Sequence, residues 1–111
     1  MSTVAELNRH GIVLPIDRIS DFCRQLGVEE LAVFGSFLRD DFRPDSDIDF
    51  LVVFQNDDYG PWMGKLQELE QELAVLLQRT VQVVPKKSVE RSENWIRRAH
   101  ILATARVIYG S

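Results

Sequence analysis

The sequence predicts an α/β fold, of the α+β kind, in which helices pack against a small mixed β-sheet. Apolar segments alternate between helical and strand periodicity along the chain, and the strongest strand, residues 48–54, is apolar almost throughout. An almost unbroken apolar strand is typical of a sheet covered on both faces. The 111 residues contain no repeat and no Pro/Gly/Ser-rich linker, so we expect one domain spanning 1–111.

The first predicted helix spans residues 15–26. Pro15 suits a first helical turn, Gly27 favours a stop, and apolar side chains recur on one face between them. These side chains are Ile16, Ile19, Phe22, Cys23 and Leu26. We therefore expect this face to join the core, with Cys23 as a buried thiol.

Two strands follow, at residues 30–34 and 48–54. The first ends at Gly35-Ser36, where a helical turn is expected, and the second runs into a polar turn that contains Asp57 and Asp58. The spacing of apolar residues then predicts a long helix that opens at Pro61, with Trp62 packing at its start. An exposed aromatic corner for a partner is the alternative for Trp62.

The C-terminal third is predicted to contain one strand and one helix. The strand covers residues 80–84 and is closed by Pro85. Ser92 can cap the last helix. Its expected buried side carries Trp95, Ile96, Ala99, Leu102, Ala103 and Val107.

The composition excludes several classes of protein. No apolar run approaches the ~20 residues that a membrane helix needs, and the N-terminal residues carry no export signal. Without such a run, no membrane contact is expected. A single cysteine excludes an internal disulfide, so a cytoplasmic location is expected. The net charge of −4 disfavours direct binding to nucleic acid.

Charge is distributed unevenly along the chain. Seven of the nine aspartates lie between residues 40 and 58, whereas basic residues predominate after residue 78. Such asymmetry points to sites and partners. Arg97, Arg98 and His100, with Arg91 nearby, could contact an acidic partner or phosphates, or could form a solvated helix face.

Gly35, Ser36, Asp47 and Asp49 are the candidate functional residues. Glycine permits close approach of an anion to the backbone, and a serine hydroxyl can donate to a phosphate oxygen. Asp47 and Asp49 open the strongest strand, and side chains two residues apart point to the same side. Two such carboxylates repel each other unless a divalent cation, Mg²⁺ or Mn²⁺, lies between them. Exposed turn aspartates are the alternative.

A calcium-binding loop is the competing interpretation of Asp45, Asp47 and Asp49. Counted from Asp45, an EF-hand needs glycine at the sixth position and glutamate at the twelfth. Phe50 and Asn56 occupy these positions, so the calcium loop is excluded.

Together these residues resemble the DNA polymerase β-like nucleotidyltransferase superfamily. The segment GSFLRDDFRPDSDIDFLV is similar to the minimal nucleotidyltransferases (MNT), the antitoxin half of HEPN/MNT toxin–antitoxin pairs, and the likeness extends from about Leu31 to a last helix over Ile96–Tyr109. The resemblance implies a nucleotidyltransferase fold in which Gly35 and Ser36 hold the triphosphate of ATP. It further implies that Asp47 and Asp49 bind Mg²⁺ or Mn²⁺.

The resemblance also implies that Arg39 steadies phosphate charge, with an ion pair to a nearby aspartate as the alternative. It implies a HEPN-type toxin as the acceptor, encoded nearby, so a hetero-oligomer is expected and a homodimer is the alternative. Members of the family carry a third carboxylate on a neighbouring strand, where this sequence has Gln82. An amide cannot accept a proton at neutral pH. Asp57 and Asp58 are possible substitutes.

These observations lead to three functional hypotheses. The first is an enzyme that transfers AMP from ATP to the partner toxin, with Asp47 and Asp49 as its catalytic residues. The second, favoured by Gln82, is a binding module that neutralises its partner by contact. Transfer to a small molecule is the third and weakest, since enzymes of that kind contain this fold as one part of a longer chain.

Overall fold

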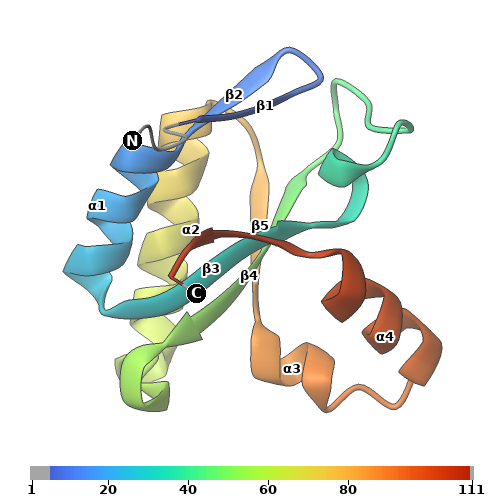
Figure 1. Cartoon of the computed structure of the whole chain (residues 1–111). Helices are drawn as coiled ribbons and strands as arrows, with labels where there is room; N and C mark the ends of the chain where they lie inside the picture. The colour runs from blue at the N-terminus through green and yellow to red at the C-terminus, as the bar shows by residue number, and fades with distance from the viewer. Residues whose placement is uncertain (1–5, 111) are drawn as a thin grey trace, which may run out of the picture.

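A computed structural model of the protein describes residues 6–110 and confirms the predicted mixed α/β fold (Figure 1). The central sheet has the strand order β5-β4-β3-β6, in which β4 and β5 are parallel and the other neighbours are antiparallel. Its strands are β3 (Val28–Phe34), β4 (Ile48–Phe54), β5 (Val81–Pro85) and β6 (Arg106–Tyr109). A separate hairpin, β1 (Glu6–Arg9) and β2 (Ile12–Pro15), precedes the first helix.

The helices lie on both faces of this sheet (Figure 1). One face packs against α1 (Ile16–Leu26) and α2 (Gly64–Leu77), and the other against α3 (Lys86–Glu90) and α4 (Trp95–Thr104). Short 3₁₀ turns cover Gly35–Leu38, Gln55–Asp57 and Pro61–Met63. Within residues 6–110, no helix has both the length and the apolar character that a membrane span requires.

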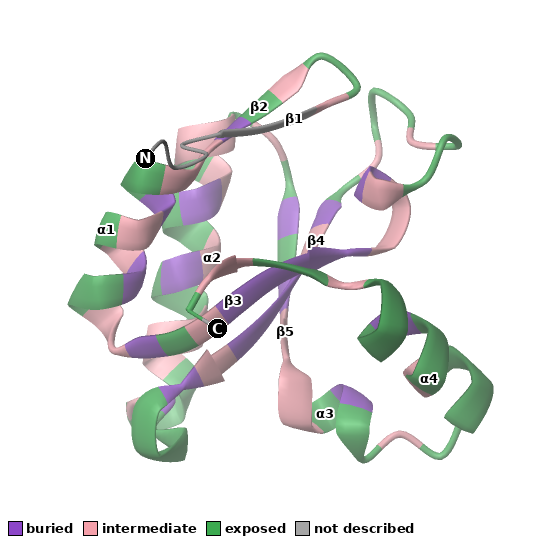
Figure 2. Ribbon diagram, viewed as in Figure 1, coloured by how far each residue is buried: buried purple, intermediate pink, exposed green. Residues whose placement is uncertain are grey.

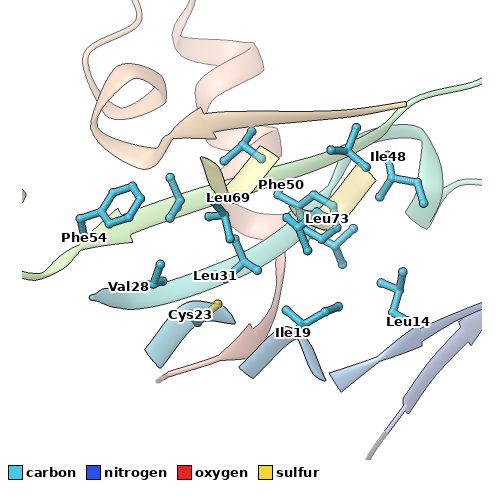
Figure 3. Close-up of a cluster of buried hydrophobic side chains, with 14 of the residues drawn as sticks. Leu14, Ile19, Cys23, Val28, Leu31, Ile48, Phe50, Phe54, Leu69 and Leu73 are labelled. Atoms are coloured by element: carbon cyan, nitrogen blue, oxygen red, sulfur yellow. The ribbon is translucent and has the colours of Figure 1, made fainter. Parts of the chain in front are cut away.

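The larger core lies between the sheet and the first two helices. Figure 3 shows Ile19 and Cys23 from α1 meeting Leu31 and Phe50 from the sheet, with Leu69 and Leu73 from α2, all fully buried. Alternation along the strands sends Ala32, Phe34 and Leu51 to the opposite face, where Val89 and Ile101 complete a smaller cluster. The strand 48–54 is thus buried from both sides, as predicted.

Helix α1 confirms the first predicted helix, because Gly27 ends it in the left-handed conformation (φ 74°). Helix α2 begins at Gly64 rather than Pro61. Trp62 and Met63 have positive φ angles of 57° and 60°, which an α-helix does not allow, so the helix can begin only after them. The expectation that Trp62 packs at the helix start is therefore wrong: its side chain is 95% exposed.

The last helix also differs from the prediction. Asn94, rather than Ser92, caps α4 by accepting a hydrogen bond from the backbone N–H of Arg97 (3.1 Å). The helix ends at Thr104, and residues 106–109 form a strand paired with β3, so a helix over 96–109 is wrong.

The expected buried side of α4 is wrong as well, because Ile101 is its buried residue. Because β6 pairs with β3, the C-terminal end of α4 is held next to the sheet. In this orientation Ile101 packs with Phe34 and Leu51. The face predicted to be buried is exposed instead, at Trp95, Ile96, Ala99, Leu102, Ala103 and Val107.

Candidate functional site

Asp49 lies in the middle of a row of residues that crosses the sheet on the face covered by α3 and α4. Phe34 of β3 is its antiparallel partner, and Gln82 of β5 is its parallel partner. Asp49 is half-buried, whereas Gln82 is exposed. The structure therefore places Gln82 on the neighbouring strand, in register with Asp49, at a position where the resemblance leads one to expect a carboxylate.

The turn at Gly35-Ser36 packs against this carboxylate. Gly35 has a φ of 77°, and a Cβ atom at this position would lie 2.5 Å from Oδ2 of Asp49. Only glycine tolerates both the left-handed backbone and so close an approach. The 3₁₀ turn that begins here leaves Ser36 half-buried beside the site and is closed by a hydrogen bond from the Arg39 N–H to the Ser36 carbonyl (2.9 Å).

Helix α4 closes the site from the other side. His100, Ile101 and Thr104 face Gly35 and Arg39 across a cleft of about 150 Å³. In Figure 1 the helix lies beside the turn that follows β3. His100 was open to several interpretations from sequence, and nothing drew attention to Thr104. The spacing of residues 97, 101 and 104, three and four apart, is the signal that places them on one helix face.

Charges from three elements act on Asp49. Its burial and, second, the charge of Asp47 raise the pKa of the Asp49 carboxyl above its ordinary value, while Arg39 and Arg97 oppose that rise. Asp47 precedes β4 and is exposed. Arg97, on α4, is thus close enough to Asp49 to act on its carboxylate. A negative charge on Asp49 is therefore disfavoured by burial and by Asp47, and a cation nearby would stabilise it.

Arg39 is exposed and forms an ion pair, Nε to Oδ1 of Asp41, at 3.2 Å. This is the alternative that the sequence left open for this residue. Because both side chains are largely in water, the pair contributes little stability and can open. Arg39 is one of the residues that line the cleft.

The loop that carries Asp47 is held by Arg79, whose role the sequence did not indicate. Arg79 Nη1 donates to the Ser46 carbonyl at 2.6 Å, and its guanidinium lies 4.9 Å from the centroid of the Phe42 ring. His10, on the tip of the first hairpin, stacks on the same ring at 4.8 Å. These contacts fix the residues directly before the aspartate pair.

Arg9 holds the Gly35–Leu38 turn from the same hairpin. Its Nε donates to the Phe37 carbonyl and its Nη2 to the Leu38 carbonyl, both at 3.0 Å. The two halves of the site are therefore positioned by residues distant in sequence, which local patterns do not reveal.

Asp57 and Asp58 do not join the site. They follow β4 at its other end, where Asp57 pairs with Lys87 (3.0 Å) and Asp58 with Lys65 (2.9 Å). Neither can substitute for the carboxylate missing at Gln82. Among the described residues, no group of three His, Cys, Asp or Glu side chains converges as a metal site.

The family described as the nucleotidyltransferase domain matches residues 16–105. A protein adenylyltransferase, MntA, from Thermococcus cleftensis is 41% identical over 66 residues, which cover 60% of this chain and 64% of that relative. The match thus spans less than two thirds of the length of this curated relative.

Two solved structures share the fold. One is provisionally designated a minimal nucleotidyltransferase; it is 28% identical, covers 81% of this chain and 85% of its own, and has a TM-score of 0.62. The other is a tri-AMPylated HEPN toxin of Shewanella oneidensis in complex with an MNT antitoxin. It is 21% identical, with a TM-score of 0.56, and covers 86% of this chain and 70% of its own.

Proposed function

This chain belongs to the nucleotidyltransferase domain family, and we propose that it is an antitoxin that transfers AMP from ATP to a HEPN-type toxin and so neutralises it. The observation that carries the proposal is the contact between the two halves of the motif. Oδ2 of Asp49 lies so close to Gly35 that a side chain there would collide with it. A nucleotide phosphate held at the turn would thus lie beside the carboxylates.

Gly35 and Ser36 are proposed to bind the triphosphate. The glycine leaves the backbone open to phosphate oxygens, and the Ser36 hydroxyl can donate to one of them. The charges of Arg39 and Arg97 both act on Asp49 and would offset phosphate charge.

Asp47 and Asp49 would hold Mg²⁺ or Mn²⁺. The donor set fits such an ion, since it consists of two carboxylates with an amide oxygen of Gln82 on the adjacent strand. Burial and, second, the charge of Asp47 raise the pKa of Asp49, which supports a cation as the partner of its ionised form. When bound, the ion supplies electrostatic stabilisation of the phosphate oxygens.

The proposed reaction joins an acceptor hydroxyl to AMP. The hydroxyl oxygen attacks the α-phosphorus, the bond to the oxygen that bridges to the β-phosphorus breaks, pyrophosphate leaves, and the hydroxyl proton passes to solvent. Gln82 cannot take that proton. A missing general base costs roughly 10²–10⁴ in rate, so transfer is expected to be slow.

A HEPN toxin as acceptor is supported by the relatives. A protein adenylyltransferase shares 41% identity with this chain over 66 residues, and the AMPylated toxin complex contains an antitoxin with the same fold. A hetero-oligomer with that toxin follows from the proposal.

Gln82 beside Asp49 favours a second candidate function, a binding module that neutralises the toxin by contact alone. The chain should be incubated with ATP, Mg²⁺ and the HEPN protein encoded nearby, and the toxin then weighed. A mass gain of one or more AMP groups, abolished by Asp47→Asn with Asp49→Asn, supports the transferase. Tight binding and inhibition of the toxin with no mass gain supports the module instead.

A further inference from the structure

Helix α4 presents its apolar side to solvent. At about 100° per residue, one arc of about 120° contains five apolar side chains. We call this arc the α4 stripe: Trp95, Ile96, Ala99, Leu102 and Ala103. Trp95 and Ile96 are each 64% exposed and Leu102 is 37% exposed, whereas Ile101 on the opposite side of the helix is buried. Figure 2 colours most of the helix as exposed.

Little of the protein itself covers the stripe. The smaller core cluster takes only Ile101 from α4. Ala99 and Ala103 keep the middle of the stripe shallow between the larger side chains of Ile96 and Leu102. A contiguous apolar strip on one helix, rimmed by polar groups, is typical of a surface that binds another protein.

The charge around the stripe indicates an acidic partner. Arg98 lies at one edge of the stripe and His100 at the other, and residues 91–106 contain four arginines against one glutamate. The chain as a whole is acidic, at −4. Pairing of two α4 stripes would bring these arginines together, which disfavours a second copy of the chain as the occupant.

The same helix closes the candidate site. His100 and Thr104 line the cleft opposite Gly35 and Arg39, and Arg97 acts on Asp49. The stripe and Ile101 face opposite ways, and His100 both borders the stripe and lines the cleft. A protein seated on the stripe would therefore reach the cleft along its His100 edge.

We propose that the α4 stripe is the docking surface for the acceptor protein, which offers an apolar groove bordered by carboxylates. The proposal rests on the proposed function, because it takes the acceptor to be a protein. It accounts for the amphipathic sequence of a helix whose apolar side does not pack against the rest of the protein.

Ile96→Glu tests the proposal, with Val75→Glu as a matched control. Both replace an exposed aliphatic residue on a helix surface, and Val75, on α2, is 77% exposed. Affinity for the HEPN protein encoded nearby is measured by titration calorimetry. We expect Ile96→Glu to weaken binding at least tenfold, through lost apolar contact and repulsion from acidic groups, and Val75→Glu to change it less than twofold.

The two tryptophans, Trp62 and Trp95, provide an independent readout in the unsubstituted protein. Both are exposed and both can be labelled as 5-fluorotryptophan. Addition of unlabelled toxin should shift or broaden the ¹⁹F signal of Trp95 and leave that of Trp62 unchanged. This measurement decides the matter even if Ile96→Glu fails to fold.

Several outcomes would overturn the docking proposal. These are an unchanged affinity of a folded Ile96→Glu, an equal loss in both glutamate variants, or a ¹⁹F change at Trp62 alone. Loss of a homodimer or of binding to phosphatidylglycerol vesicles in Ile96→Glu, with toxin affinity retained, would assign the stripe to a second copy or to a lipid surface.

The same samples separate this proposal from the proposed function. If the toxin binds through the stripe but carries no AMP, the docking proposal stands and the proposal of AMP transfer is rejected. If Ile96→Glu transfers AMP as well as the parent protein does at subsaturating toxin, the proposal of AMP transfer stands and the docking proposal is rejected.

Discussion

Asp49 of β4 and Gln82 of β5 are paired in register across parallel strands, with Asp49 half-buried and Gln82 exposed at the sheet edge. A carboxylate at position 82 would therefore stand beside Asp49 without any rearrangement of the backbone.

Gln82→Asp should raise metal-dependent AMP transfer. The new carboxylate can accept the hydroxyl proton and add a ligand to the aspartate pair, and a general base contributes roughly 10²–10⁴ in rate. We expect at least a tenfold gain in single-turnover transfer of labelled AMP to the toxin. Gln82→Asn is the control, and no gain in Gln82→Asp relative to it would contradict the proposed role of this position.

Gly35→Ala should damage both the fold and the site. A side chain here adopts a φ of 77° and meets Oδ2 of Asp49 at 2.5 Å, so we expect a loss of about 1–2 kcal/mol from the backbone alone and a displaced carboxylate. Gly27→Ala is the matched control, since Gly27 has a φ of 74° and nothing within 4 Å of the added methyl group. Urea denaturation should show a loss in both variants, and only Gly35→Ala should lose the rise in Tm with ATP and Mg²⁺.

Asp49→Asn should stabilise the protein in the absence of metal. Burial and the charge of Asp47 raise the pKa of Asp49, so its ionised form is unfavourable in the folded state at pH 7. The folded state binds this proton more tightly than the unfolded state does. The contribution of Asp49 to stability therefore falls as the pH rises from the ordinary pKa of an aspartate toward the raised pKa of the folded protein. Thermal melts at pH 7 should give Asp49→Asn a higher Tm than the parent in EDTA, and added Mg²⁺ should reverse the order.

Arg79→Ala should loosen the loop that carries Asp47. The substitution removes the hydrogen bond to the Ser46 carbonyl and the contact with the Phe42 ring, at a cost of about 1.5–3 kcal/mol for a charged donor. The concentration of Mg²⁺ that gives half-maximal transfer should rise severalfold. Arg18→Ala, on the exposed surface of α1, is the control and should leave that concentration unchanged.

Cys23 should be unreactive until the protein unfolds. The side chain is fully buried, and burial raises the pKa of its thiol to about 12, so almost no thiolate exists at pH 8. Alkylation by iodoacetamide at pH 8, followed by mass spectrometry, should be slow in buffer and rapid in concentrated urea. Fast labelling in buffer would show that α1 opens locally.

Several parts of the fold could be predicted because their signals are local. The helix over residues 16–26 and the strand over 48–54 follow from periodicity, Pro15 and Gly27. The hairpin at residues 6–15, helix α3 and strand β6 were not predicted. The two hairpin strands, α3 and β6 are each only four or five residues long, and α3 and β6 are stabilised by packing or pairing with distant segments, which short-range patterns do not report.

The candidate site divides in the same way. Alternation along a strand was enough to put Asp47 and Asp49 on one side of the chain. The family resemblance brought Gly35-Ser36 and Gln82 to the same site, and the strand pairing of the structure sets Phe34 and Gln82 on either side of Asp49. The contributions of Arg9, Arg79 and Thr104 were not accessible, since their contacts join segments far apart in the chain.

The sequence by itself determined the class of fold, the motif of the candidate site and the amphipathic character of the last helix. Only the tertiary structure decided which way that helix faces. Amphipathicity specifies that an apolar side exists, but it does not specify what covers that side. Here β6 pairs with β3 and draws Ile101 onto the sheet, which leaves Trp95 and Ile96 in solvent and brings Arg97 and His100 to the site.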